Sequence, residues 1–451
     1  MESLFKLKEN GTDVRTEVIG GVTTFLSMVY ILAVNPSILS ASGMDAAAVF
    51  TATAISAAFA TILMAFLANY PIALASGMGL NAYFAYTVCG DLAKMGINDP
   101  WKVALTAVLV EGIIFILLTL CKFREALVND VPANLKLGIT AGIGLFIALV
   151  GLKGAGIVVT DPSTVVALGD LGSAPVVLAL VGFLVVAVMY HFRVPGYILW
   201  GILVTWILGM IAQAGGWYHV DVNAGSYSLF PDFSHGIKPT APHAVAFDFG
   251  FVAGHVIDFL VVVFSFLFVD LFDTAGTLIG IGEKANFLDR NGKLPGAGRA
   301  LMADAIGTVF GACMGTSTVT SYVESNTGVA AGARTGLASV VTGLLFLLAL
   351  PLSPVFTAIP SFATAPALLF VGLMMCSALR GMDFEDDAAG AVGGYLALIM
   401  MPFSYSIANG IMFGMLSYVV IRIFQGRIKD VEWVVWVAVV LFIGRIISLI
   451  A

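Results

Sequence analysis

The chain has 451 residues, of which 59% are hydrophobic and only 11% are charged, and its mean hydropathy is +1.00. Soluble domains carry about 25% charged residues, so the composition excludes an ordinary soluble protein. The net charge of −7 is modest and gives no reason to expect nucleic acid as a partner. Many apolar runs reach the roughly 17–25 residues that cross a bilayer, which predicts an all-α polytopic membrane protein in contact with lipid.

The N-terminal residues 1–17 are polar and mixed in charge. They lack the short apolar region and small-residue cleavage site of a secretory signal, so we expect no cleaved signal peptide. The distribution of positive charge predicts that these residues lie in the cytoplasm. The four cysteines lie in or at the ends of apolar segments, with no CxxC or Cys/His cluster. The sequence therefore predicts no metal site, no disulfide framework and no cofactor.

Apolar runs and their breakers predict fourteen transmembrane segments. A polar stretch at 216–249, expected to be an extracytoplasmic loop, separates two halves of seven. A last apolar run at 431–449 forms either a fifteenth span or a helix along the membrane interface. In chain order the segments are 18–39, 46–68, 78–92, 101–121, 132–151, 175–191, 195–214, 250–282, 298–313, 321–334, 335–352, 363–380, 386–403 and 406–424.

The distribution of lysine and arginine predicts the orientation. With the N-terminus in the cytoplasm, most of these residues fall in connections on the cytoplasmic side. The opposite connections hold only Lys94, Lys102, Lys153 and Lys238. Positive charge collects on the cytoplasmic side of membrane proteins, so the bias supports both the orientation and the segment count.

Two irregular stretches, residues 69–86 and 312–329, occupy corresponding places in the two halves. Each runs through small, glycine or β-branched residues and then opens a short segment with one polar group. Aligning them places Asn81 on Glu324 and Gly77 on Thr320. Transporters hold substrates between such broken segments of inverted repeats, although close helix packing through small residues would give a similar pattern.

Carboxylates inside membrane spans are costly and point to function. Asp270 and Asp273 are three positions apart on a helix and share a face, as a site that couples proton movement requires. Glu324 opens a half-helix among hydroxyl groups. Asp304 fits a structural role as well as a ligand contact, and Glu111 fits a protonated packing residue. The scarcity of cationic partners favours a substrate with N–H groups, a cation or a proton over an inorganic anion.

Three motifs carry a family resemblance: "SGMGLNAYFAY" at 76–86, "VDLFDTAGTLIG" at 269–280 and "GTSTVTSYVESNTGVAAGARTGL" at 315–337. Together they resemble the azaguanine-type purine permeases, a branch of the nucleobase–ascorbate transporter superfamily. The resemblance runs from about Thr16 to Phe424.

The resemblance implies two inverted repeats of seven segments, with short strands in segments 3 and 10. Residues 18–121, 250–334 and 335–352 would form a core domain, and residues 132–214 and 363–424 a gate domain. The implied activity is proton-coupled import of adenine, guanine and hypoxanthine across the cytoplasmic (inner) membrane. The run at 431–449 has no counterpart in this plan.

The resemblance also implies the site. Glu324 would bind the base, with Asp270, Asp273 and Asn81 as further contacts. The motif neighbourhood adds Thr320 and Ser321, and Phe84 is a candidate aromatic face for stacking. Proton coupling would fall to Asp270, Asp273, Asp304 and Glu324. The wider superfamily spaces the partner of a segment-eight glutamate four residues on, whereas this chain has a spacing of three, so which aspartate touches the base stays open.

Other classes of function find less support. An anion exchanger or channel of the same fold would need a cation near the half-helix ends. An intramembrane hydrolase would need a GxGD-like, Gly-x-Ser-x-Gly or HExxH motif, and the chain has none, so we expect no enzyme. The sequence does not rank the purines, and it leaves open proton against sodium coupling, and monomer against homodimer.

Overall fold

The computed structural model describes residues 2–121, 132–220, 228–233, 239–285, 287 and 294–450. Parts of the loop predicted at 216–249, including Lys238, lie outside the described residues. The elements of the first half are α1 (Glu2–Phe5), α2 (Val14–Met28), α3 (Ile31–Leu39), η1 (Ser40–Ser42), α4 (Ala46–Leu67), β1 (Leu74–Ser76), α5 (Met78–Ala82), η2 (Tyr83–Val88), α6 (Cys89–Lys94), α7 (Pro100–Leu120), α9 (Ala133–Gly154), β2 (Val158–Asp161), β3 (Val165–Leu168), α10 (Ala174–His191) and α11 (Tyr197–Ala214).

The second half also places a short strand, β4 (Val319–Ser321), among long helices. Its elements are α12 (Gly250–Gly254), α13 (Val256–Lys284), α14 (Ala297–Met314), β4 (Val319–Ser321), α15 (Ser325–Ala330), α16 (Gly336–Leu348), η4 (Leu350–Leu352), α17 (Ser353–Thr357), α18 (Ser361–Cys376), η5 (Ser377–Gly381), α19 (Ala388–Phe403), α20 (Ile407–Phe424), η6 (Ile428–Asp430) and α21 (Trp433–Ile450).

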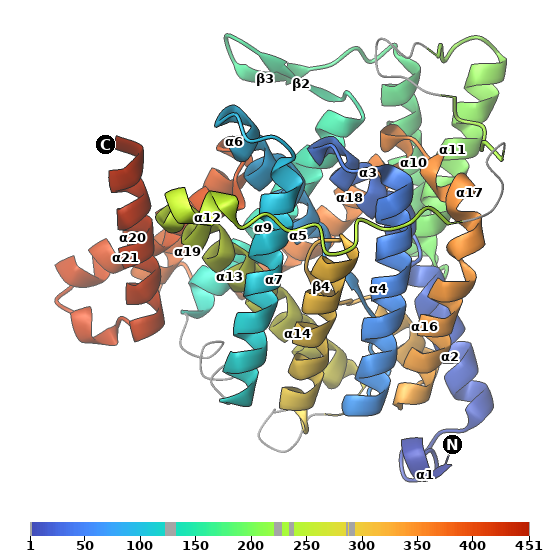
Figure 1. Cartoon of the computed structure of the whole chain (residues 1–451), viewed down its shortest axis with the longest axis horizontal. Helices are drawn as coiled ribbons and strands as arrows, with labels where there is room; N and C mark the ends of the chain where they lie inside the picture. The colour runs from blue at the N-terminus through green and yellow to red at the C-terminus, as the bar shows by residue number, and fades with distance from the viewer. Residues whose placement is uncertain are drawn as a thin grey trace.

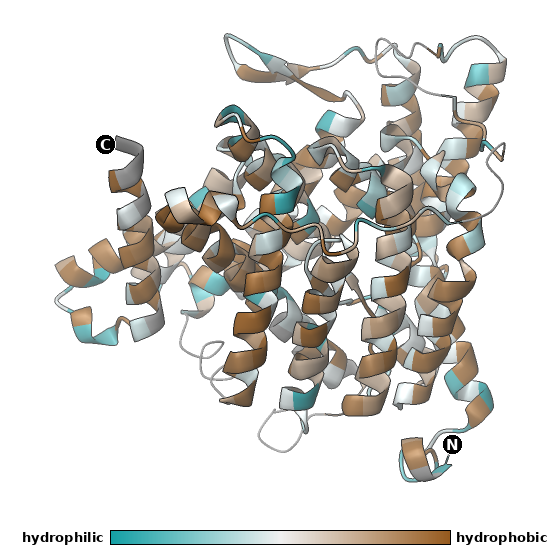
Figure 2. Cartoon of the chain, in the orientation of Figure 1, coloured by the Kyte–Doolittle hydropathy of each residue, from teal (hydrophilic) through white to brown (hydrophobic). Residues whose placement is uncertain are grey.

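The long helices stand side by side (Figure 1), and α4 and α7 are hydrophobic along most of their length (Figure 2). In the described part of the chain, eight helices are long and apolar enough to cross a membrane, or nine if the bent pair that joins α16 to η4 and α17 counts as one span. The predicted all-α membrane fold is therefore confirmed. The count of fourteen segments and the division into core and gate domains stay predictions.

Helix starts follow local capping chemistry. Asp13 and Asp45 precede α2 and α4, and each carboxylate accepts a 2.7 Å hydrogen bond from a backbone N–H in the first turn. Such caps satisfy donors that have no partner within the helix. The predicted spans 18–39 and 46–68 therefore begin at α2 and α4.

The two broken segments meet in the middle of the molecule. Strands β1 and β4 pair antiparallel, with Leu74 opposite Ser321 and Ser76 opposite Val319. Each strand satisfies the backbone groups of the other, which is what extended chain at membrane depth requires. A half-helix follows each strand: α5 after β1, and α15 after β4. The strands predicted for segments 3 and 10 are confirmed.

Two local features were not predicted. A second antiparallel hairpin, β2–β3, connects α9 to α10 and lies at the end of the molecule opposite the N-terminus (Figure 1). The helix after α5 widens into a π-helix at η2 before it continues as α6. Neither feature leaves a clear mark in hydropathy, which was the main signal for the segments.

The last apolar run, predicted at 431–449, forms helix α21. This helix contacts α13 and α20, and its buried side chains include Val435, Ala438 and Phe442. The ring of Phe442 lies 6.0 Å from that of Phe264, measured between centroids. The run is therefore a packed helix that joins a predicted core helix to a predicted gate helix.

Candidate substrate site

A cavity of about 80 Å³ lies where the paired strands meet the helices around them. Pockets for drug-sized ligands have volumes of roughly 300–1,000 Å³, so this cavity is several times smaller than those. The described residues that line it are Gly77, Met78, Gly79, Ile143, Ile147, Val269, Asp273, Thr277, Thr320, Ser321, Tyr322, Val323, Glu324, Val371 and Met375.

The two walls of this cavity differ in polarity. All of its carboxylate and hydroxyl side chains come from the predicted core, namely from α13, from β4 and from the turn between β4 and α15. The predicted gate helices α9 and α18 contribute only apolar side chains, from Ile143, Ile147, Val371 and Met375. A ligand would therefore make its side-chain hydrogen bonds to one wall and only apolar contacts with the other.

Glu324 stands directly before α15 and is 8% exposed. The hydroxyl of Tyr30, at the junction of α2 and α3, donates a 2.6 Å hydrogen bond to its Oε1 atom. Tyr30 itself is completely buried. The hydroxyl of Tyr30 thus holds one oxygen of the carboxylate, and the Glu324 side chain still lines the cavity.

Asp273 reaches the same cavity from the middle of α13, and the hydroxyl of Thr320 lies beside its carboxyl group. Ser321 also lines the cavity, and its buried hydroxyl has no hydrogen-bond partner in the described structure. A buried polar group without a partner is costly, so a polar ligand at this position would satisfy it. Four predicted site residues, Glu324, Asp273, Thr320 and Ser321, therefore come together.

Asp270 and Asp304 form a second acidic group next to the cavity but outside its lining. The hydroxyl of Thr274 lies 3.0 Å from an oxygen of each carboxyl group. One hydroxyl has a single hydrogen to donate, so both contacts are hydrogen bonds when one carboxyl group carries a proton. Glu111 on α7 is a further buried carboxyl group, and it accepts a 2.8 Å hydrogen bond from Thr318.

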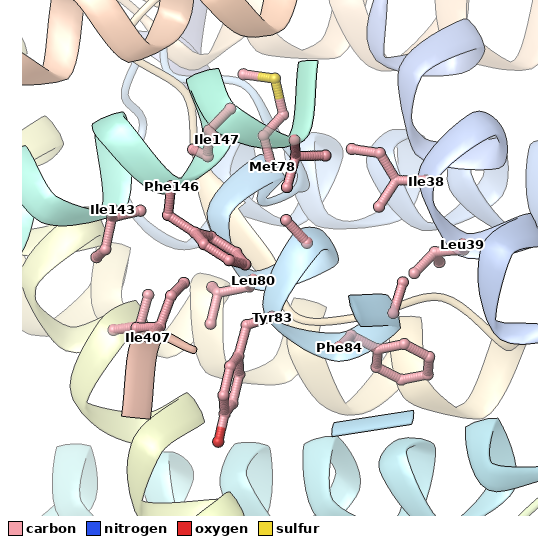
Figure 3. Close-up of a cluster of buried hydrophobic side chains, with 14 of the residues drawn as sticks. Ile38, Leu39, Met78, Leu80, Tyr83, Phe84, Ile143, Phe146, Ile147 and Ile407 are labelled. Atoms are coloured by element: carbon pink, nitrogen blue, oxygen red, sulfur yellow. The ribbon is translucent and has the colours of Figure 1, made fainter. Parts of the chain in front are cut away.

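Asn81 and Phe84 lie elsewhere than in the cavity lining. The side-chain oxygen of Asn81 accepts hydrogen bonds from Ser76 (2.7 Å) and from Ser317, so the amide ties the ends of the two strands together. The ring of Phe84 belongs to the buried apolar cluster drawn in Figure 3 and lies 6.4 Å from that of Phe266. Met78, Ile143 and Ile147 join this cluster to the cavity.

The strand positions correct the alignment of the two repeats. Counted from the first residue of each strand, Asn81 corresponds to Asn326, and Glu324 corresponds to Gly79. The sequence alignment was shifted by two positions and missed the register in which Ser76 matches Ser321 and Asn81 matches Asn326. Glu324 and Gly79 both line the cavity, so the symmetric positions face one site.

Sequence reasoning missed Tyr30 and the apolar wall. A tyrosine in an apolar run resembles ordinary packing, and nothing in the sequence shows that its hydroxyl meets Glu324. The wall residues of α9 and α18 sit in helices that are apolar all round, so no periodicity marks the face that turns to the cavity.

These features define a multi-pass membrane transporter: a bundle of apolar helices around a small, buried, partly acidic cavity between two broken segments. A family model described as "Permease family" matches residues 15–407. The chain belongs to this family, which confirms the resemblance seen in the motifs. The relatives below are named permeases, which are transporters rather than enzymes.

Among the relatives, the chain is 43% identical to the adenine permease AdeP of Escherichia coli (strain K12), over 99% of this chain and 96% of that protein. It is also 43% identical to the guanine/hypoxanthine permease PbuG of Bacillus subtilis (strain 168), over 98% of each. Among solved structures, the transmembrane domain of the cyanobacterial bicarbonate transporter BicA matches with a TM-score of 0.64 at 16% identity, covering 88% of this chain and 97% of that one. SLC26A9 matches with a TM-score of 0.65 at 14% identity, covering 91% and 66%. At such identities the two structures show the fold alone.

Proposed function

We propose that the protein imports the purine nucleobases adenine, guanine and hypoxanthine by proton symport. The observation that carries the proposal is the convergence of Glu324 and Asp273 on one small cavity whose other wall is apolar. The names of the relatives AdeP and PbuG, at 43% identity over nearly the whole chain, point to the same substrates.

The chemistry of a purine suits this cavity. Its planar edge carries N–H donors and ring-nitrogen acceptors, and a carboxylate accepts hydrogen bonds while a hydroxyl both donates and accepts. Glu324 and Asp273 supply the acceptors, and Ser321 supplies a hydroxyl with no partner of its own. The flat faces of the base would lie against apolar side chains such as Ile147 and Val371. Asn81 then acts by holding the strands in register rather than by contact.

The group formed by Asp270, Thr274 and Asp304 suits the coupling proton. The hydroxyl of Thr274 contacts both carboxyl groups, so a proton bound by one of them takes part in the same hydrogen-bonded group. Asp273, which lines the cavity, is the residue before Thr274. A proton that enters this group changes the charge beside the base, so the affinity for the proton and the affinity for the base depend on each other. Asp270 and Asp304 would therefore serve coupling, whereas Asp273 and Glu324 would serve both coupling and binding.

The unequal walls suit movement of the core domain against the gate domain, of the elevator or rocking type. A base held by hydrogen bonds to the core alone loses none of them when the core slides along the apolar gate. The lysine and arginine bias supports a cytoplasmic N-terminus. Import of a base into the cell would place the protein in the cytoplasmic membrane.

An anion exchanger or channel is the alternative suggested by the fold of the bicarbonate transporter. Among the described lining residues, however, there are two carboxylates and no lysine, arginine or histidine. An inorganic anion would meet repulsion at such a site, whereas a neutral base with N–H groups would not.

Uptake of radiolabelled adenine in cells that express the protein tests this function. Unlabelled adenine, guanine and hypoxanthine should compete, uptake should be faster at pH 6 than at pH 8, and a protonophore should abolish accumulation. Uptake that bicarbonate inhibits and purines do not would overturn the proposal.

A further inference from the structure

Tyr30 occupies a position fixed by unusually close helix packing. It stands between α2 and α3 at the point where α2 meets the half-helix α15. The two helices approach through glycine: a Cβ atom on Gly328 would lie 2.6 Å from the carbonyl oxygen of Gly20. The Thr327 hydroxyl adds a 3.0 Å hydrogen bond to the hydroxyl of Ser27. The ring of Tyr30 therefore has little freedom relative to α15.

The hydrogen bond that Tyr30 donates is short. At 2.6 Å from its oxygen to Oε1 of Glu324, it falls in the range of O–H···O⁻ bonds, which are about twice as strong as neutral ones. Both groups are buried, so water does not compete for the contact. The other titratable groups facing Glu324 in the described structure are Asp273 on α13, Tyr322 after β4 and Tyr197 at the start of α11.

We propose that Tyr30 is a positioning residue that gives the two oxygens of Glu324 different roles. Oε1 is committed to the tyrosine, so Oε2 is the atom that meets the ligand. When Glu324 is ionised, Oε2 accepts an N–H group of the base. When Glu324 is protonated, Oε1 still accepts from Tyr30, so the hydrogen sits on Oε2 and is donated to a ring nitrogen.

The consequence is that the substrate edge and the proton on Glu324 share one atom. Tyr30 would set both the affinity for the base and the way in which that affinity changes with pH, without touching the base itself. This inference rests on the proposed purine transport and adds to it a residue that positions the binding carboxylate.

Tyr30→Phe removes the hydroxyl and keeps the ring. Binding of tritiated adenine, guanine and hypoxanthine to the purified full chain should be measured from pH 5 to pH 9. We expect Kd to rise about tenfold, which corresponds to the loss of one hydrogen bond to a charged group, and the pH dependence of Kd to change shape. The matched control is Tyr418→Phe, which removes a buried tyrosyl hydroxyl that accepts from Arg422 on α20. It should leave both quantities unchanged.

A second variant covers the case in which Tyr30→Phe does not fold. Replacement of Tyr30 by 3-fluorotyrosine nearly preserves the shape and makes the hydroxyl a stronger donor. It should shift the pH profile of Kd while leaving thermal stability unchanged. An unchanged pH profile in either variant would overturn the role of Tyr30. Failure of the wild-type protein to bind any of the three bases would instead overturn the proposed function.

Discussion

Glu324 and Asp273 line the same cavity although one opens the half-helix α15 and the other lies in the middle of the long helix α13. The pairing of β1 with β4 makes this meeting possible, because it places the start of α15 deep inside the helix bundle. Two carboxylates in one buried site are costly unless a proton or a hydrogen-bonding ligand accompanies them. The proposed proton symport depends on this relationship.

Replacement of Glu324 by alanine should abolish uptake while membrane expression stays near normal. The substitution removes the acceptor that holds the base, and kcat/KM for adenine should fall at least about a hundredfold. Glu385→Ala, at an exposed position between η5 and α19, is the control for loss of a carboxylate. Uptake like that of the wild type by Glu324→Ala would remove Glu324 from the site.

Substitutions of Asp273 and Asp270 should affect the affinity for adenine and the coupling to protons separately. Asp273 lines the cavity and Asp270 does not, so Asp273→Asn should raise KM for adenine about tenfold. Asp270→Asn should leave KM within about twofold and flatten the dependence of uptake on external pH. Initial uptake rates between pH 5 and pH 8 measure both effects. If neither variant changes either property, the assignment of coupling to this pair fails.

Much of the fold could be predicted because helices embedded in lipid are recognised in a sequence by their length and hydropathy. Predicted spans such as 46–68 and 406–424 agree within a residue or two with α4 and α20. The broken segments were also visible, since small and β-branched residues at membrane depth are unusual. The hairpin β2–β3 and the π-helix η2 were not, because each depends on a few backbone conformations rather than on hydropathy.

The site was predicted in part for a related reason. Charges inside a membrane are rare, so Glu324, Asp273 and Asp270 stood out in the sequence. Which of them share a cavity depends on how each helix is rotated about its own axis. Helices that are apolar all round have no polar face in the sequence pattern from which this rotation could be predicted. The same limit hid the partnership of Tyr30 with Glu324 and the place of Phe84 away from the cavity lining.

Thr274→Val tests the acidic group beside the cavity. The hydroxyl that contacts both Asp270 and Asp304 is lost with little change of volume, so each buried carboxyl group loses one hydrogen-bond contact. We expect the free energy of unfolding to fall by about 1–3 kcal/mol. The dependence of uptake on pH should also weaken. Thr140→Val in α9, where the hydroxyl only bonds back to its own helix, should change neither. Equal behaviour of the two variants would contradict a role for Thr274.

Gly328→Ala tests the close approach of α2 and α15. The added methyl group would lie 2.1 Å from the hydroxyl oxygen of Thr24, so the helices must separate. Overpacking of this kind lowers the free energy of unfolding by about 1–3 kcal/mol. The displacement of α15 should also move Glu324 and so weaken adenine binding. Gly90→Ala in α6, where a Cβ atom meets nothing within 4 Å, is the matched control. Thermal unfolding and adenine binding, measured for both variants, report the two effects. An unchanged Kd in Gly328→Ala would show that the packing does not position Glu324.

Accumulation of adenine in proteoliposomes containing only this protein tests the central claim most directly. Vesicles with a neutral interior are diluted into buffer at pH 6 or at pH 7, with sodium absent in both cases. Proton symport predicts that adenine accumulates above its external concentration only with the proton gradient, and that Glu324→Ala abolishes this accumulation. Equal adenine uptake with and without the gradient, or no accumulation in either buffer, would contradict proton symport of a purine base.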